Sequence, residues 1–109
     1  MATYVIVTHP VKDFDAWKSV FDEFEQLRKD AGELTAVVLR HADDPNIVSV
    51  LNTWTSVDAA KAFVASEEIK KGMGEAGVTA PPTFVFANSD QPRELLAHEV
   101  MISANGENI

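Results

Sequence analysis

The sequence contains no cysteine, and this absence excludes disulfides, thiolate nucleophiles and thiolate metal sites. Cations are also few, since nine lysines and arginines stand against 17 acids and leave a net charge of −8. Proteins that bind nucleic acid or anionic membranes gather basic residues into patches. The paired lysines, Lys70 and Lys71, are preceded by Glu67 and Glu68, with Ile69 between the two pairs. We therefore expect no nucleic-acid partner and no membrane surface as a partner.

Long hydrophobic runs are missing as well. No stretch approaches the roughly 20 apolar residues that span a bilayer, and Met1-Ala2-Thr3-Tyr4 has no basic leader region. These features predict a cytoplasmic protein. The length of 109 residues fits one domain. A domain of this size buries only about 60–65% of the surface of its unfolded chain, so a partner that covers more would stabilise it.

The first half of the chain has a strand pattern followed by a helix pattern. Residues 3–9 are mostly β-branched or aromatic and end at Pro10, which predicts a strand. Asp13 is a suitable N-cap for a helix that ends at Gly32, a residue typical of the position after a helix. The apolar residues between them recur at helical spacing. They are Phe14, Trp17, Phe21, Phe24 and Leu27.

The second half repeats this order after a hairpin. Residues 34–41 and 46–54 predict two strands joined by the turn Ala-Asp-Asp-Pro. Ser56 then begins a helix with a possible break near Ser66, and the glycines at 72, 74 and 77 are expected to end it. Residues 83–88 predict the last strand. The order βαββαβ indicates an α+β, ferredoxin-like domain, a four-stranded antiparallel sheet with two helices on one face.

We expect this domain to span residues 1–88, with residues 89–109 as a separate C-terminal extension. Pro92 could begin a short helix there. The extension is either a frayed terminus or an arm that packs on a partner subunit.

Both faces of the predicted sheet are apolar. Val5 and Val7 point to one side of the first strand, whereas Tyr4 and Ile6 point to the other. Helices cover one face, and an antiparallel sheet that meets water on its other face should be polar there. The simplest cover for the second face is a second copy of the chain, which predicts a homodimer.

Four stretches carry a resemblance to a known family. They are Asp13-Phe-Asp-Ala-Trp17, Leu27-Arg-Lys-Asp-Ala-Gly32, His41-Ala-Asp-Asp-Pro-Asn46 and Asn52-Thr-Trp-Thr-Ser-Val-Asp-Ala-Ala-Lys-Ala-Phe63. With them, residues 3–88 resemble the dimeric α/β-barrel superfamily, in particular its antibiotic-biosynthesis-monooxygenase-like (ABM-like) domains. The resemblance implies a dimeric α/β barrel. It leaves the chemistry open, because such proteins include cofactor-free quinone-forming oxygenases, haem-degrading enzymes, polyketide cyclases and isomerases.

Two histidines end predicted strands that run in the same direction. His9 and His41 should therefore lie at one edge of the sheet, about 10 Å apart across the intervening strand. They could flank a pocket and transfer protons, or each could be an ordinary exposed strand-end histidine. His9 is the preferred general base, because it continues the apolar face of Val5 and Val7.

The opposite edge offers Asn52 and Trp54. Asn52 could bond a loop carbonyl or act as a donor that orients a ligand, and Trp54 could be core or pocket wall. Trp17 and Phe21 belong to the aromatic helix stripe, which is either core or part of a pocket between sheet and helices. The resemblance places Phe63 where haem-degrading relatives carry an iron-ligating histidine, so haem degradation is not expected. No cofactor and no metal are expected.

Two kinds of function fit these features. One is a homodimeric enzyme that oxygenates or cyclises an aromatic or polyketide-like molecule without a cofactor. In that enzyme His9 and Asn52 would be catalytic, and Trp17, Phe21, His41, Trp54 and Phe63 would contact the hydrophobic substrate. The other is a non-catalytic binding or structural dimer. A cavity into which His9 or Asn52 points favours the enzyme, and a sealed core favours the alternative.

Overall fold

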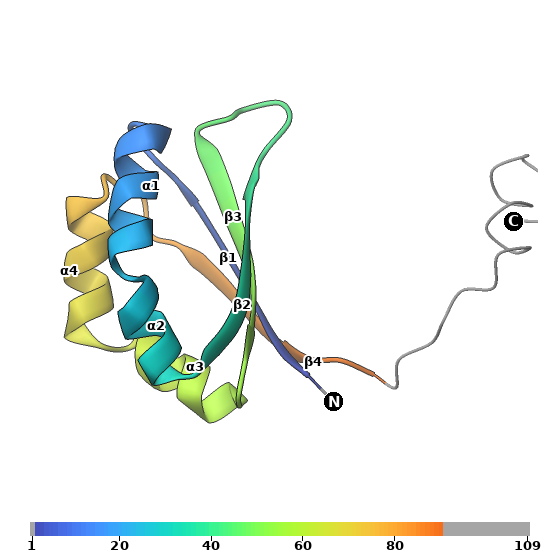
Figure 1. Ribbon diagram of the computed structural model, residues 1–109. Coiled ribbons are helices and arrows are strands. Elements are labelled where there is room, and N and C mark those ends of the chain that lie inside the picture. Colours follow the sequence, from blue (N-terminus) through green and yellow to red (C-terminus); the bar gives the residue numbers. More distant parts are fainter. Residues whose placement is uncertain (1, 91–109) are drawn as a thin grey trace, which may run out of the picture.

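The structure is a computed structural model, and it describes residues 2–90. Figure 1 shows a sheet with the helices α1 to α4 on one side of it. The elements follow one another as β1 (Thr3–Pro10), α1 (Phe14–Glu23), α2 (Glu25–Ala31), β2 (Glu33–Arg40), β3 (Ile47–Trp54), α3 (Val57–Val64), α4 (Glu67–Glu75) and β4 (Thr83–Asn88). The predicted C-terminal helix lies outside the described residues.

The sheet has the strand order β2-β3-β1-β4, and its paired strands are all antiparallel. Central strand β1 pairs with β3, where Val5 faces Asn52, and with β4, where Val5 faces Phe86. This is the ferredoxin-like α+β fold, as predicted. The sheet does not close on itself, so β2 and β4 are its edges.

The predicted first helix is divided into α1 and α2 at Phe24. Its N-cap is confirmed, because Asp13 Oδ1 accepts hydrogen bonds from the backbone N–H groups of Asp15 and Ala16. The break has a local cause. The Phe21 carbonyl accepts from the Phe24 N–H and from the Arg28 guanidinium, so it is not available for the usual helical bond. Gly32 follows α2 with φ 122°, which favours glycine.

The predicted break near Ser66 is confirmed, since the Ser66 hydroxyl accepts from the Ile69 N–H and caps α4. The glycines behave differently from expectation. Helix α4 continues through Gly72 and Gly74, and only Gly77, with φ 78°, lies beyond its end. Gly72 remains helical because tertiary packing requires a small residue there: a Cβ atom at Gly72 would lie 2.6 Å from Phe24 Cε2.

Two alanine substitutions in α4 should therefore have opposite effects. Gly72→Ala forces the Phe24 ring to move and should lower the free energy of unfolding by about 1–3 kcal/mol. Gly74→Ala is the matched control, because nothing lies within 4 Å of its added Cβ atom. It should raise stability by up to about 1 kcal/mol through helix propensity. Urea unfolding of both variants measures the difference, and equal effects would contradict this packing.

The two faces of the sheet differ in burial. Towards the helices, side chains such as Val5, Val48 and Val50 are buried. On the other side lies what we call the open face, where large aliphatic or aromatic side chains are 36–52% exposed. They are Tyr4, Ile6, Val37, Leu39 and Val85. No helix among the described residues is long and apolar enough to cross a membrane.

Candidate functional site

An apolar cavity of about 80 Å³ lies between the helix-facing side of the sheet and the helices. The sheet supplies side chains from β1, β3 and β4, which alternate inward along each strand. Helix α1 supplies the aromatic rings of Trp17 and Phe21, and Phe24 adds a ring just beyond the end of α1. Helices α3 and α4 supply further wall residues of the cavity. Its residues that matter for the chemistry are His9, Trp17, Phe21, Asn52, Trp54 and Phe63.

Three polar atoms are buried at this cavity without a hydrogen-bond partner. They are His9 Nδ1, Asn52 Oδ1 and Trp54 Nε1. A buried polar atom without a partner costs about 1–3 kcal/mol. Most proteins avoid such atoms, and each one calls for an explanation. All three belong to residues that line one cavity, which is the arrangement expected of a site that binds a polar ligand group.

His9 is 3% exposed and lies beside Trp17, with 5.7 Å between the ring centroids. Its side chain faces the helices because it alternates inward with Val5 and Val7. Burial lowers the pKa of His9 below its ordinary value of 6.5, since the charged imidazolium loses its hydration. The imidazole is therefore neutral at pH 7 and can accept a proton.

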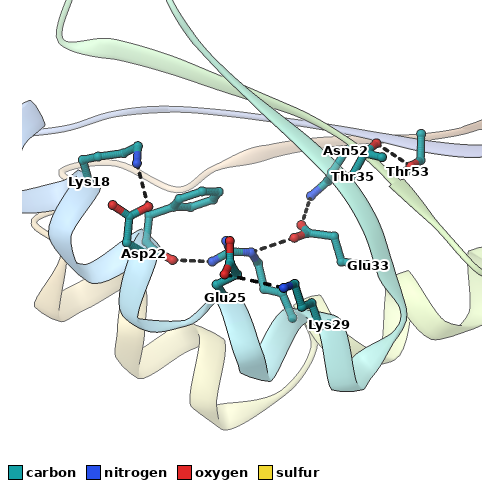
Figure 2. Close-up of polar contacts among 10 residues, drawn as sticks. Lys18, Asp22, Glu25, Lys29, Glu33, Thr35, Asn52 and Thr53 are labelled. Atoms are coloured by element: carbon teal, nitrogen blue, oxygen red, sulfur yellow. Dashed lines mark hydrogen bonds and ion pairs between the residues drawn. The ribbon is translucent and has the colours of Figure 1, made fainter.

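Asn52 belongs to a buried polar chain that runs from the cavity to the helices. Its Nδ2 donates to Glu33 Oε2 at 3.0 Å, and the other Glu33 oxygen accepts from Arg28 Nε at 2.9 Å. Figure 2 shows Glu33 with its contact to Asn52. Arg28 also stacks on Phe21, with 3.7 Å from its Cζ to the ring centroid, and donates to the Phe21 carbonyl.

The Arg28–Glu33 ion pair is 6–7% exposed at its side chains. Arg28 lines both the apolar cavity and a polar cleft of about 350 Å³ between α1, α2 and β2, whereas Glu33 lines only the cleft. Neither Arg28 nor Glu33 stands out in the sequence as a candidate site residue. A charged pair five residues apart across a glycine is the only sequence signal for it, and that spacing is common on protein surfaces.

The expected aromatic residues contribute to the wall. Trp54 packs on Phe63 with 5.3 Å between centroids, and Trp17 stacks on Phe21 at 5.0 Å. Phe63 is an apolar wall residue from α3, so it supplies no ligand atom for iron. The two tryptophans and two phenylalanines thus form two contacting pairs in the lining of the cavity.

His41 does not line this cavity. Its Nε2 lies 2.9 Å from the Ser49 hydroxyl, which also contacts the Thr8 hydroxyl at 2.7 Å. Ser49 and Thr8 alternate with the inward residues and so belong to the open face. His9 and His41 therefore lie near the same edge of the sheet but on opposite faces, and His41 is not in the lining of this cavity.

His9 and Asn52 lie at different ends of the cavity. In the β1–β3 register His9 faces Val48, whereas Asn52 faces Val5. Four residues of strand separate these positions, which corresponds to about 13 Å along the sheet. Trp54 is two residues beyond Asn52 on the same face. A ligand would therefore meet His9 at one end and the Asn52–Trp54 pair at the other.

Within residues 2–90, no group of three or more histidine, aspartate or glutamate side chains is placed to hold a metal ion. The residues with unpartnered polar atoms, His9, Asn52 and Trp54, lie in a lining that is mostly apolar. The arrangement combines an apolar space with the hydrogen-bonding side chains Asn52 and Trp54 at one end and a neutral imidazole, His9, at the other.

Comparisons with known proteins agree with this fold. Among solved structures, a candidate antibiotic biosynthesis monooxygenase from Nitrosomonas europaea is 17% identical, with a TM-score of 0.67 over 85% of this chain and 94% of that one. A similar candidate from Bordetella bronchiseptica is 14% identical, with a TM-score of 0.69 over 83% and 98%. SnoaB, a cofactor-independent oxygenase from Streptomyces nogalater, is 20% identical, with a TM-score of 0.61 over 84% and 97%.

At these identities the structural likeness establishes the fold. A search of curated proteins finds no match. The sequence profile of the antibiotic biosynthesis monooxygenase family (ABM) matches residues 7–75, which is more than half of the chain and includes every candidate site residue named above. The chain therefore belongs to the antibiotic biosynthesis monooxygenase family.

Proposed function

We propose that this protein is a cofactor-independent monooxygenase that acts on a small aromatic substrate in the cavity between sheet and helices. The observation that carries the proposal is that His9, Asn52 and Trp54 line one apolar cavity and each has a buried polar atom without a partner: Nδ1, Oδ1 and Nε1, respectively. SnoaB, which has the same fold, is a cofactor-independent oxygenase, and this lends further support.

The reaction class can be written in balance with dioxygen alone. A hydroxyarene with a free para position, such as 1-naphthol, takes up one O2 and gives a para-quinone and one water. One oxygen atom becomes the new carbonyl, and the other leaves as water with two substrate hydrogens. The protein would remove protons, exclude bulk water and hold the ring in place.

The layout of the cavity divides these tasks between its ends. The Asn52–Trp54 end would hold the substrate oxygen, and neutral His9 would take the proton from the carbon that is oxidised at the far side of the ring. Because the pKa of His9 is lowered, the imidazole is already unprotonated near neutral pH.

The volume of the cavity limits the substrate. An engineered cavity of about 150 Å³ holds one benzene molecule, whereas this one measures about 80 Å³. Even a one-ring substrate thus requires some displacement of wall side chains, and flexible Met73 is the most adaptable of them. Three fused rings require a larger opening, so we propose that smaller substrates are preferred.

A size series tests the proposal. Phenol, 1-naphthol and anthrone are each incubated with the protein under ¹⁸O2, and quinone formation is followed by absorbance and mass spectrometry. We expect a quinone with one ¹⁸O atom, formed faster from the smaller substrates. Saturable binding without any quinone would instead support the non-catalytic binding protein, and no binding at all would contradict a ligand site here.

The pH dependence should follow His9. Only the neutral imidazole accepts a proton, so kcat/KM should rise with pH and reach half its maximum below pH 6.5, because burial lowers this pKa. The free energy of unfolding should change with pH in the same direction. The unfolded chain binds a proton at His9 near pH 6.5 and the folded chain only at lower pH, so stability falls as pH drops below 6.5. His9→Gln should remove this part of both slopes. A midpoint above 6.5 would contradict the burial effect.

We also propose that the protein is a homodimer joined through the open face, which would complete an α/β barrel. The support is the set of exposed apolar side chains there, including Ile6 at 39% and Val37 at 50% exposure. Such a patch on an antiparallel sheet is typical of a buried interface.

Sedimentation equilibrium tests the dimer. At micromolar concentration the protein should have twice the mass of 11.9 kDa. Ile6→Glu places a charge in the proposed interface and should give monomers or weaken association at least tenfold. Leu27→Glu is the matched control, since Leu27 is similarly exposed at 40% but lies on α2. A folded wild-type monomer would contradict the proposal.

A further inference from the structure

We infer that Glu33, held by Arg28, is a positioning residue that makes the site selective for ligands carrying a hydroxyl group. This inference rests on the proposed function, because it assumes that the cavity binds a ligand. It adds a specificity determinant outside the cavity wall, since Glu33 itself does not line the cavity.

The first step is the orientation of the Asn52 amide. A carboxylate offers only acceptors, so the Asn52 group that contacts Glu33 Oε2 at 3.0 Å must be the NH2 donor. Arg28 holds this carboxylate in place through its Nε at 2.9 Å, in an ion pair whose side chains are 6–7% exposed. The carboxylate of Glu33, which can only accept, therefore fixes the orientation of the Asn52 amide. The Asn52 Oδ1 atom is left without a partner.

The second step is the pattern that a ligand meets. Asn52 Oδ1 is an acceptor, and Trp54 Nε1 can only donate. The two residues lie two positions apart on the same face of β3, so their Cα atoms are about 7 Å apart. One hydroxyl oxygen between them can donate to Asn52 and accept from Trp54. An ether or ketone oxygen can only accept, and it leaves Asn52 Oδ1 buried without a partner.

The third step is the role of the ion pair. Without the Glu33 carboxylate, the Asn52 amide can turn over and present its NH2 group to the cavity. The site would then accommodate an ether or ketone as well as a hydroxyl. Glu33 would thus act through Asn52, without touching the ligand, and its effect should appear in selectivity rather than in overall affinity.

Phenol and anisole are suitable probes, because they share one ring and differ in the hydroxyl donor. Dissociation constants for both are measured by NMR titration of the full chain. We expect the wild type to bind phenol about tenfold or more tightly than anisole. In Glu33→Gln the ratio should fall to about twofold, because an amide at position 33 accepts either orientation of Asn52.

Glu33→Gln leaves Arg28 buried without its counter-charge and so can fail to fold. The double variant Arg28→Met/Glu33→Met removes both charges, and such replacements are often neutral for stability. The same loss of selectivity is expected from it. Glu33→Asp is the conservative comparison, because it keeps the carboxylate and should retain part of the preference for phenol.

The outcomes separate the inference from the proposed function. A folded Glu33→Gln or double variant that keeps the wild-type ratio overturns the role of Glu33 and leaves the ligand site in place. A wild type that binds both probes equally overturns the hydroxyl selectivity. A wild type that binds neither overturns the ligand site and, with it, this inference.

Discussion

We expect His9→Ala to lower turnover of the best substrate by about 100-fold or more, which is the usual scale for loss of a general base. His9 is the only described histidine in the cavity wall, and its Nδ1 is buried without a partner. The substitution removes the proton acceptor and leaves the other end of the cavity unchanged. Substrate binding, measured as Kd, should change much less than kcat.

The matched control is His41→Ala. His41 lies on the open face and bonds Ser49, so its loss should change turnover about twofold at most, provided that the oligomeric state is unchanged. Sedimentation and thermal unfolding of both variants show whether fold and assembly survive. If His9→Ala keeps more than a tenth of wild-type turnover, His9 is not the base. If the His9→Ala variant keeps its turnover and only its stability changes, the role of His9 is structural.

The second large effect concerns the stability of the Arg28–Glu33 pair. Arg28→Met should lower the free energy of unfolding by about 3–5 kcal/mol, because it leaves the buried Glu33 carboxylate without its counter-charge. Loss of the hydrogen bond to the Phe21 carbonyl and of the stacking on the Phe21 ring acts in the same direction. Urea unfolding at one fixed protein concentration measures the change.

Lys29→Ala is the control from the same helix. Lys29 pairs with Glu25 at 3.6 Å, but both side chains are at least 60% exposed, so this pair should contribute less than about 1 kcal/mol. Adding Glu33→Met to Arg28→Met should recover most of the lost stability. Equal effects of Arg28→Met and Lys29→Ala would show that burial of the ion pair has no energetic consequence.

The fold could be predicted from the sequence because its signals are local and periodic. Residues 3–9 are mostly β-branched or aromatic, with side chains that alternate between the two faces, and the helix after Asp13 has an N-cap and apolar residues at helical spacing. The order βαββαβ is that of ferredoxin-like domains. The break at Phe24 could not be predicted, since it depends on the Arg28 side chain reaching the Phe21 carbonyl. The helical Gly72 likewise depends on a tertiary contact with Phe24.

The candidate site was predicted less completely. Strand alternation predicted that His9 shares a face with Val5 and Val7, whereas Asn52 and Trp54 were assigned to the opposite edge of the sheet. The structure places all three candidate residues in the lining of one cavity. His41 was selected by its edge of the sheet, which does not say which face a side chain occupies. The contact between His41 and Ser49 shows that the alternation of side chains along the strand is the better guide to the face that a residue occupies. Asn52 was expected to act as a donor, but Glu33 engages its amide nitrogen, and the group left without a partner is the acceptor Oδ1.

The central claim is that the cavity binds a hydroxyarene at Asn52 and Trp54, and the indole N–H of Trp54 reports on it directly. The chain contains two tryptophans, so two indole signals are expected in a ¹H–¹⁵N spectrum, and Trp54→Phe assigns them. We predict that phenol shifts the Trp54 signal downfield and saturably, by more than that of Trp17, because its unpartnered N–H gains an acceptor. A Trp54 signal that stays unchanged at millimolar phenol would contradict the account.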